Sequence, residues 1–209
     1  MIELNKIIHA DCMDIRRDIP DKYFELAIVD PPYGINAGSM VMGKGKNKQW
    51  ARNNMWDICP PDEKYFTEIM RVSVKQIIWG GNYFNLPLTG GWIFWDKERG
   101  KDVSFSDGEL AWTNFLKVLK KVSIRYDGFI GKDATRIHPT QKPVSLYRWL
   151  LQNYAKTGDK IIDTHSGSGS CAIACHLEKF EFLAIEKDKD YYEASVKRLD
   201  EVRSQGVLF

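Results

Sequence analysis

Several features that mark secreted or membrane proteins are missing from this sequence. No apolar run approaches the roughly 18 residues that would span a bilayer. The N-terminus, MIELNKIIHADCMD, carries acidic residues and lacks the pattern of a secretory signal. The 209 residues include only four cysteines and no C-x-x-C pair, and a chain of this length needs no disulfide to hold it together. We therefore expect a cytoplasmic protein with reduced thiols.

A strong charge of one sign is also lacking, because the net charge is only +2. Hydrophobic residues make up 44% of the chain and charged residues 28%, as in ordinary soluble globular proteins. We find neither repeats nor a low-complexity linker, so the length favours a single domain over residues 1–209. Cys171 and Cys175 are four residues apart on a predicted helix, where two buried thiols are more common than a metal pair. We predict no metal site.

Strand and helix patterns alternate along the chain. Apolar segments predict strands at 4–9, 25–30, 76–80, 91–96, 109–115, 121–127, 159–163 and 181–186. Helices are predicted at 12–18, 62–74, 143–155, 169–178 and 189–203. This alternation indicates an α/β fold, with a doubly wound, mostly parallel sheet and helices on both faces. The short link between 109–115 and 121–127 favours a hairpin at one edge.

An apolar run ends abruptly in the segment ELAIVDPPYG, residues 25–34. The run itself predicts a buried strand, and Pro31 and Pro32 stop it because proline has no N–H for a sheet ladder. The Asp30 carboxylate and the Tyr33 ring are thereby placed on a stiff turn at the end of the strand. Most Asp-Pro pairs only end strands, so the other motifs must decide whether this one carries chemistry.

A glycine-rich loop follows another predicted strand near the C-terminus. Strand 159–163 leads into Gly167-Ser168-Gly169, then a helix, then a strand that ends at Glu186. Glycines let the backbone approach a ligand, a helix N-terminus favours polar or negative groups, and an acid at a strand end accepts hydrogen bonds from ribose hydroxyls. The spacing also fits the dinucleotide fingerprint, so a nicotinamide or flavin oxidoreductase is a competing hypothesis.

The position of this loop argues against a dinucleotide fold. Such folds carry the fingerprint on their first strand and need several further strand–helix units, whereas the sequence has room for one helix after Glu186. A nucleotide-like cofactor without a pyrophosphate, such as S-adenosylmethionine, fits better. Ligands of open α/β sheets bind outside the carboxyl ends of strands. Asp30 and the glycine loop would therefore face one crevice if their strands are neighbours.

Three motifs together resemble those of a known enzyme family, the amino-methylating DNA methyltransferases. The resemblance is carried by Asp30-Pro31-Pro32-Tyr33, His138-Pro139-Thr140-Gln141-Lys142-Pro143 and Asp163-Thr-His-Ser-Gly167-Ser-Gly169-Ser. The catalytic motif precedes the cofactor motif, which is similar to the β group of this family. The segments IIWGGNYF, GWIFWDK and SDGELAWTNF look like those of small phage and prophage enzymes. One departure is His165, which stands where the family usually has an aromatic residue.

The resemblance implies a Rossmann-like methyltransferase fold in permuted motif order, with seven strands of which one is reversed near an edge. It implies a site-specific enzyme that transfers a methyl group from S-adenosylmethionine to adenine N6 in DNA, with cytosine N4 as the alternative acceptor. An inactive DNA-binding homologue is the non-enzymatic alternative. Asp30 would accept one N–H of the amine and the Pro31 carbonyl the other, on the stiff turn that Pro32 completes, while Tyr33 would stack on the base.

The same resemblance implies a set of residues around the cofactor. Glu186 would bind the ribose and Asp11 the adenine, and Thr140 and Lys142 would lie by the methionine carboxylate. A solvated charge before a helix is the competing interpretation of Lys142. The full set is Asp11, Cys12, Asp30, Thr140, Gln141, Lys142, Asp163, His165, Gly167, Ser168, Gly169, Ser170, Glu186 and Lys187.

Double-stranded DNA is the implied partner, with the target base flipped out of the helix. A basic loop at 34–58 is expected to be mobile and to face DNA through Lys44, Lys46, Lys48, Trp50 and Arg52. Only 97–107 and 128–137 are spare for target recognition, so recognition is short and relaxed, or is shared with a second subunit in a homodimer. The end, Gln205 to Phe209, resembles peptides that dock on bacterial sliding clamps, with a frayed or self-packed tail as the alternative. A nucleoid location in a bacterial or phage-infected cell would follow.

Overall fold

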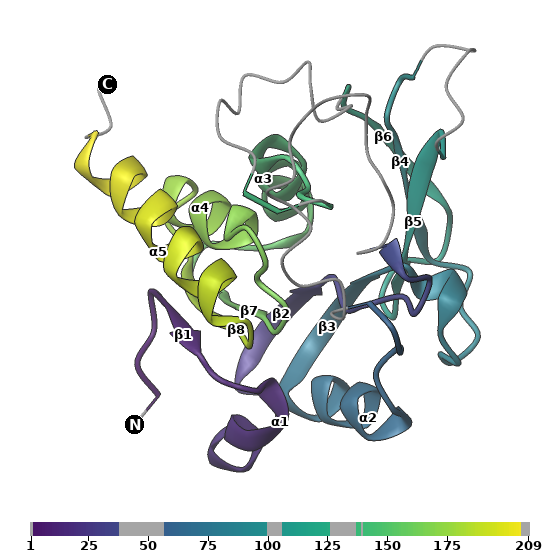
Figure 1. Ribbon diagram of the computed structural model, residues 1–209. Coiled ribbons are helices and arrows are strands. Elements are labelled where there is room, and N and C mark those ends of the chain that lie inside the picture. The colour runs from purple at the N-terminus through teal and green to yellow at the C-terminus, as the bar shows by residue number, and fades with distance from the viewer. Residues whose placement is uncertain (1, 38–56, 100–105, 126–136, 139, 206–209) are drawn as a thin grey trace.

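The computed structural model describes residues 2–37, 57–99, 106–125, 137–138 and 140–205. Within them, the strands are β1 (Lys6–His9), β2 (Phe24–Val29), β3 (Ser73–Trp79), β4 (Trp92–Asp96), β5 (Gly108–Thr113), β6 (Lys120–Ser123), β7 (Lys160–Asp163) and β8 (Glu181–Glu186). They form one sheet in the order β1-β8-β7-β2-β3-β5-β4-β6 (Figure 1). All neighbours are parallel except those of β5, which runs antiparallel to both β3 and β4.

Helices cover both faces of this sheet. They are α1 (Cys12–Ile15), α2 (Glu63–Val72), α3 (Val144–Tyr154), α4 (Ser170–Leu177) and α5 (Lys189–Ser204), with the short 3-10 helices η1 (Arg16–Asp18) and η4 (Gly81–Tyr83). Helices α3, α4 and α5 lie together on one face, and α1 and α2 lie on the other (Figure 1). The predicted doubly wound α/β fold is thereby confirmed.

The central strand β2 shows why both faces must be covered. Leu26, Ala27, Ile28 and Val29 are fully buried. Leu26 and Ile28 belong to the apolar cluster that includes α3 and α4, whereas Ala27 and Val29 belong to the cluster that includes α2. Alternate side chains of a strand point to opposite faces, so a continuous apolar run is stable where helices pack on both sides.

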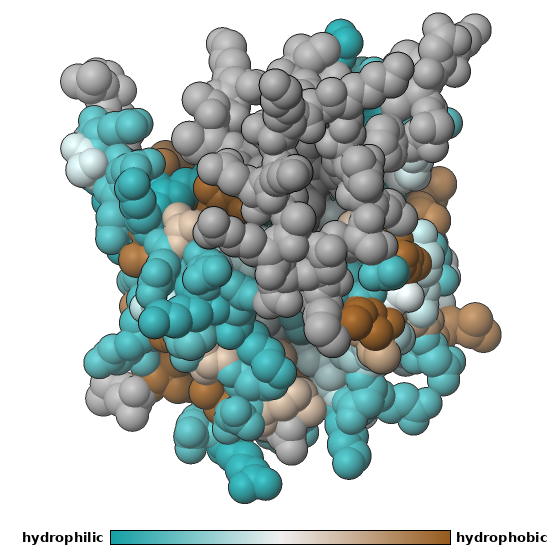
Figure 2. Space-filling model, viewed as in Figure 1, coloured by the Kyte–Doolittle hydropathy of each residue, from teal (hydrophilic) through white to brown (hydrophobic). Residues whose placement is uncertain are grey.

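The outer side of α5 is polar. Of its sixteen residues, only Ser195, Arg198 and Leu199 are buried. The region of α5 is accordingly coloured mostly hydrophilic in the space-filling view (Figure 2). This helix packs on the sheet through a narrow stripe and presents charged side chains to solvent.

The edge of the sheet corrects two expectations. Over the described residues the sheet has eight strands and not seven, and the predicted hairpin of 109–115 with 121–127 does not form, since β5 and β6 do not pair. Strand β5 lies between β3 and β4, while β6 pairs in parallel with β4 at the edge. The physical reason lies in the link after β5, whose Leu116 and Lys117 carbonyls lie against Gly91 and Gly90, just before β4. The link therefore crosses the start of β4, and β6 pairs on its far side.

Two smaller features also differ from prediction. Helix α2 ends at Val72 and β3 begins at once at Ser73, so the predicted helix 62–74 is too long. Ser73 Oγ donates to Ile69 O over 2.5 Å, which satisfies a carbonyl at the helix end. The short helix η4 after β3 was not predicted.

The sheet order fixes where ligands can bind. From β7 the chain passes through α4 to β8 on one side, and from β2 it passes through α2 to β3 on the other. The chain therefore winds outward in opposite directions from the boundary between β7 and β2. Such a switch point is where open α/β sheets bind their ligands.

Candidate active site

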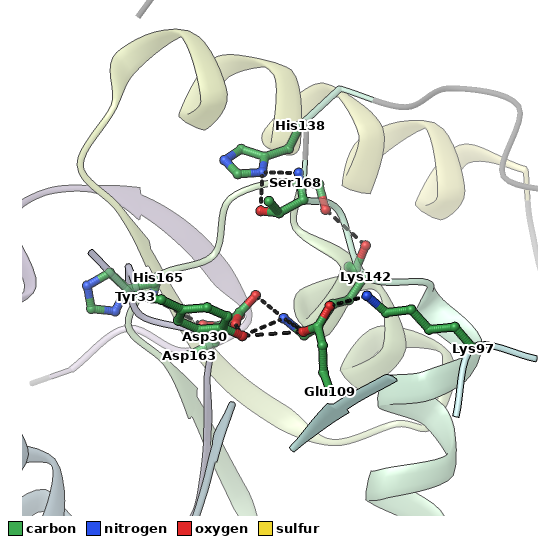
Figure 3. A network of polar contacts seen from close by, with 11 residues as sticks. Asp30, Tyr33, Lys97, Glu109, His138, Lys142, Asp163, His165 and Ser168 are labelled. Carbon is green, nitrogen blue, oxygen red and sulfur yellow. Dashed lines mark hydrogen bonds and ion pairs between the residues drawn. The ribbon is translucent and has the colours of Figure 1, made fainter. Parts of the chain in front are cut away.

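The predicted catalytic and cofactor motifs lie at the ends of neighbouring strands. Ala27 of β2 pairs with Ile162 of β7 in parallel register. Asp30 follows β2 directly and Asp163 is the last residue of β7, so both carboxyl groups lie at the same edge of the sheet (Figure 3). The sequence predicted that Asp30 and the glycine loop would face one crevice if their strands were neighbours. Strands β2 and β7 are neighbours, so both motifs lie at the same switch point.

Both oxygens of the Asp30 carboxylate are held by neighbours. Tyr33 Oη donates to Oδ1 over 2.7 Å, and Lys142 Nζ donates to Oδ2 over 2.5 Å (Figure 3). Burial raises the pKa of Asp30, and the Lys142 ammonium opposes that rise. Pro31 is buried and Pro32 is half-buried, so the turn is fixed by packing as well as by its rings. The Asp30 side chain keeps 19% of its surface exposed, which leaves it accessible to a hydrogen-bond donor.

A chain of alternating charges continues from Asp30 through Lys142 to Glu109 and Lys97. Lys142 Nζ lies 2.9 Å from Glu109 Oε2, and Lys97 Nζ lies 2.5 Å from Glu109 Oε1. Burial favours a higher pKa for Glu109, but Lys142 and Lys97 overcome it and lower that pKa to about 2. Burial disfavours the charged form of Lys142, yet its two carboxylate partners raise its pKa. Glu109 and Lys142 are therefore charged at neutral pH.

The sequence alone did not single out Glu109 and Lys97. Glu109 lies inside β5, and Lys97 directly follows β4 in a segment expected to serve target recognition. The signal that could have found Glu109 is a carboxylate within an apolar strand pattern. Charged side chains are seldom buried unless they are paired, so such a residue predicts a buried partner without naming it.

The turn before α3 places Lys142 in the site. Lys142 is only 4% exposed, so its interpretation as a solvated charge is wrong. Gln141 Oε1 accepts a hydrogen bond from Ile137 N over 3.1 Å, and Thr140 N donates to His138 Nδ1 over 3.3 Å. These bonds hold the turn in shape. A contact of Thr140 and Lys142 with a cofactor carboxylate stays a prediction.

Aromatic side chains surround Tyr33. The rings of Tyr33 and Tyr83 are stacked, with centroids 5.0 Å apart and planes 14° apart, and Phe84 meets Tyr33 edge-on. Tyr83 belongs to η4 and is 48% exposed. Stacked aromatic rings of this kind suit the face of a nucleobase. The sequence predicted such a contact for Tyr33 but not for Tyr83.

The glycine-rich loop after β7 has the conformation and the free groups of a ligand cradle. Gly167 and Gly169 have φ values of +50° and +73°, in the left-handed region that favours glycine. Gly167 N donates to Glu186 Oε2 over 2.7 Å. Gly169 provides no side chain to cap the start of α4, and the buried Ser166 Oγ has no hydrogen-bond partner among the described residues. This donor and acceptor set fits the carboxylate and ribose of S-adenosylmethionine.

Ser168 and Ser170 anchor this loop to the protein. Their hydroxyl oxygens lie 3.0 Å apart. Arg198 of α5 donates through Nη1 to Ser168 O over 3.0 Å and to Ser170 Oγ over 2.9 Å. These contacts give both serines a structural role, and their contact with a cofactor stays a prediction.

The pKa values of Asp163 and His165 are strongly shifted. Burial raises the pKa of Asp163 to about 8, although the hydrogen bond from His165 N opposes the rise. Burial lowers the pKa of His165 to about 4, so its ring is neutral at pH 7. The His165 ring packs edge-on to Tyr65. Shifts of this size are typical of functional sites, and a cationic ligand beside Asp163 would favour its ionised form.

The remaining predicted cofactor residues lie at the ends of β1 and β8. Lys187 and Asp11 form an ion pair at 2.8 Å. Burial raises the pKa of Cys12 to about 12, which keeps it a thiol. Glu186 Oε1 accepts a hydrogen bond from Asp188 N over 2.8 Å. Because β1 pairs with β8 and β8 with β7, these residues line the same edge of the sheet as Asp163.

Other expected segments lie outside the described residues. These include the DNA-facing residues Lys44, Lys46, Lys48, Trp50 and Arg52, together with 100–105, 128–136 and 206–209. Among the described residues, none of the helices combines the length with the apolar character that a membrane span requires. The same residues contain no cluster of three His, Cys, Asp or Glu side chains arranged to hold a metal ion.

Comparisons with known proteins agree with this geometry. Residues 95–197 match the N6/N4 methyltransferase family, described as DNA methylase. The Type II methyltransferase M.HinfI of Haemophilus influenzae is 21% identical over 96% of this chain and 69% of its own length. The crystal structure of the M1.HpyAVI–SAM complex has a TM-score of 0.64 at 19% identity, covering 93% of this chain and 98% of that one. PvuII DNA methyltransferase, which is cytosine-N4-specific, has a TM-score of 0.59 at 10% identity, covering 96% and 91%.

The solved structures show the methyltransferase fold, and the family match covers β5, β7, α4 and β8 of this chain. The match decides against the nicotinamide or flavin hypothesis that the glycine spacing left open. The match over residues 95–197 and the similarity to Type II methyltransferases along most of the chain support an N6/N4 DNA methyltransferase whose methyl donor is S-adenosylmethionine.

Proposed function

We propose that this protein methylates N6 of an adenine flipped out of double-stranded DNA, with S-adenosylmethionine as the methyl donor. The observation that carries the proposal is the parallel pairing of β2 with β7, which brings Asp30 and Asp163 to one edge of the sheet. Methyl transfer needs donor and acceptor atoms about 3–3.5 Å apart in line. Two motifs at one switch point would bind the methyl donor and the acceptor base side by side.

The cradle around Asp163 is suited to the cofactor. S-adenosylmethionine, when bound, supplies an electrophilic methyl group on a positively charged sulfur. Asp163, Gly167 and Gly169 would hold its methionine part, Glu186 its ribose and Asp11 its adenine. A buried carboxyl group with a pKa of about 8 favours a cationic ligand, because a nearby positive charge offsets the cost of burying the carboxylate.

Asp30 and Pro31 prepare the acceptor. An exocyclic base amine is a poor nucleophile because its lone pair is delocalised into the ring. Asp30 accepts one N–H and the Pro31 carbonyl accepts the other, which turns the lone pair toward the methyl group. Asp30 also stabilises the positive charge that develops on the nitrogen and accepts the proton that the nitrogen then releases. Loss of such electrostatic stabilisation typically slows a reaction about 10²–10³-fold.

Tyr33 and its neighbours would receive the base. A base inside a duplex cannot reach this edge of the sheet, so it must leave the helix at a cost of a few kcal/mol. The Tyr33 ring is fixed by its hydrogen bond to Asp30 and by packing on Tyr83. A ring fixed in this way can stack on the flipped base with little further loss of entropy.

The choice of adenine rests on Asp30. Serine at this position is commoner in the cytosine-N4 enzymes that the sequence resembles, whereas aspartate favours adenine. The PvuII enzyme, whose fold is similar, is cytosine-N4-specific. Cytosine N4 is therefore the alternative that an experiment must separate.

The test is to identify the modified nucleoside. The protein is incubated with duplex DNA of mixed sequence and S-adenosylmethionine carrying a labelled methyl group, and the DNA is digested and analysed by mass spectrometry. We expect labelled N6-methyldeoxyadenosine, and none from the Asp30→Ala protein. Labelled N4-methyldeoxycytidine would show instead that the target base is cytosine. The absence of any methylated nucleoside would contradict the proposal.

A further inference from the structure

Lys142 stands between two carboxylates at the active site. Its Nζ lies 2.5 Å from Asp30 Oδ2 and 2.9 Å from Glu109 Oε2 (Figure 3). The side chain of Lys142 is 3% exposed, whereas that of Asp30 is 19% exposed. Lys142 therefore reaches Asp30 from the protein interior and leaves the outer side of the carboxylate to a ligand.

The position of this lysine is fixed by more than the two ion pairs. Its Nζ lies 5.3 Å from the centroid of the Trp79 ring and 5.7 Å from that of Tyr33, within the range of cation–π attraction. A lysine bound to Asp30 alone would weaken that residue as a catalyst. Its positive charge would offset the negative charge that Asp30 must offer to the acceptor nitrogen.

Glu109 is placed to limit the neutralisation of Asp30 by Lys142. Its Oε2 binds Lys142, and its Oε1 is held by Lys97 at 2.5 Å. The Glu109 carboxylate is thus oriented by a second lysine, and its negative charge competes with Asp30 for Lys142. Lys97 follows β4 and Glu109 lies on β5, two strands that pair with each other, so the sheet itself holds this arrangement.

We propose that Glu109 is a positioning residue for methyl transfer, which binds Lys142 and so keeps the Asp30 carboxylate available to the target amine. The inference rests on the proposed function, because it concerns the binding of an amine by Asp30. When the amine arrives, Lys142 gives up part of its contact with Asp30 and keeps Glu109 as its partner. No buried charge is then left unpaired, which is the condition that makes such a shift inexpensive.

The test compares Glu109→Gln in two backgrounds. In the wild-type background we expect kcat to fall about 10²-fold, the usual effect of misplacing a catalytic group, with the affinity for S-adenosylmethionine unchanged. In a Lys142→Gln background the same change should have little further effect, because Glu109 acts through Lys142. The matched control is Lys121→Gln, which removes the exposed ion pair of Lys121 with Asp96 on β4 and should leave kcat unchanged.

Two results would overturn the inference. One is an unchanged kcat in Glu109→Gln, and the other is an equal loss of kcat in both backgrounds, which would mark a structural effect. Thermal unfolding of each variant shows whether it folds. If Glu109→Gln does not fold, Glu109→Asp decides, since a shortened carboxylate should give an intermediate kcat and a wild-type kcat would contradict the inference. Failure of the proposed function is distinct, because the wild-type protein would then methylate no nucleoside.

Discussion

Gly80 lies directly against the ring of Tyr33. A β-carbon on residue 80 would lie 2.5 Å from Cδ1 and 2.6 Å from Cζ of that ring. The φ of Gly80 is +67°, a conformation that side-chain-bearing residues seldom adopt. The end of β3 is therefore built to hold the aromatic ring that follows Asp30, and only glycine satisfies both conditions.

Gly80→Ala should displace Tyr33 and slow methylation. The new methyl group requires the ring to move, and the hydrogen bond from Tyr33 to Asp30 would be lost or lengthened. We expect a fall in kcat of about 10²-fold, as for other misplaced catalytic groups. The affinity for S-adenosylmethionine should stay within about twofold, because the proposed cofactor cradle lies at the ends of β7 and β8. Steady-state methylation and calorimetric binding measure both quantities.

Gly158→Ala is the matched control for this variant. Gly158 has a φ of +91°, and a β-carbon there would meet no atom within 4 Å. The substitution should cost about 1–2 kcal/mol in unfolding free energy from backbone strain and leave methylation intact. Equal losses of activity in both variants would show that strain, and not displacement of Tyr33, is responsible.

Asp163 should make stability depend on pH. Burial raises its pKa in the folded protein to about 8, above the ordinary 3.8. Its contribution to stability is therefore complete below about pH 4 and is lost as the pH rises to about 8. Asp163→Asn stays neutral throughout, so the unfolding free energy of the wild type should fall relative to that of the variant across this window. Denaturant unfolding of both proteins without cofactor, at a series of pH values, measures the difference. A difference in unfolding free energy that does not change with pH would contradict the raised pKa of Asp163.

Asp57 should stabilise the turn that follows Tyr33. It is 1% exposed, and it accepts hydrogen bonds from Gly34 N over 2.9 Å and from Ala37 N over 2.8 Å. Asp57→Ala removes both acceptors, and we expect it to lower the unfolding free energy by about 2–4 kcal/mol. Asp57→Asn keeps one acceptor oxygen and should cost less. Chemical denaturation measures the loss of unfolding free energy in each variant. Equal losses in the two variants would contradict the role of the Asp57 oxygens as hydrogen-bond acceptors.

The sequence predicted those parts of the fold that local patterns determine. Each of the eight strand candidates corresponds to a strand, because runs such as Leu26 to Val29 are buried on both faces. The predicted hairpin of 109–115 with 121–127 was wrong, because β5 and β6 lie on opposite sides of β4. Strand β6 has a single buried residue, Val122. Such a pattern is compatible with pairing to β5, as predicted, or to β4, as observed. The pairing of β6 with β4 depends on the link after β5, whose path is set by tertiary hydrogen bonds.

Some residues of the candidate site could be predicted from the sequence and others could not. Asp30, Tyr33 and the glycine loop stand in short motifs whose local backbone can be read from the sequence, so they could be proposed as site residues before the fold was known. Glu109 and Tyr83 lie far from Asp30 in the chain, and they reach the site through strand pairing and the η4 turn. Pairing of this kind leaves no signature in a single sequence.

The most direct measurement is single-turnover methylation of DNA by Asp30→Ala, with the affinity for S-adenosylmethionine determined on the same preparation. If Asp30 binds the target amine beside an independent cofactor cradle, methyl transfer should be slower by at least about 10²-fold while the dissociation constant of the cofactor is unchanged. Methyl transfer at the wild-type rate, or loss of cofactor binding together with transfer, would contradict the account.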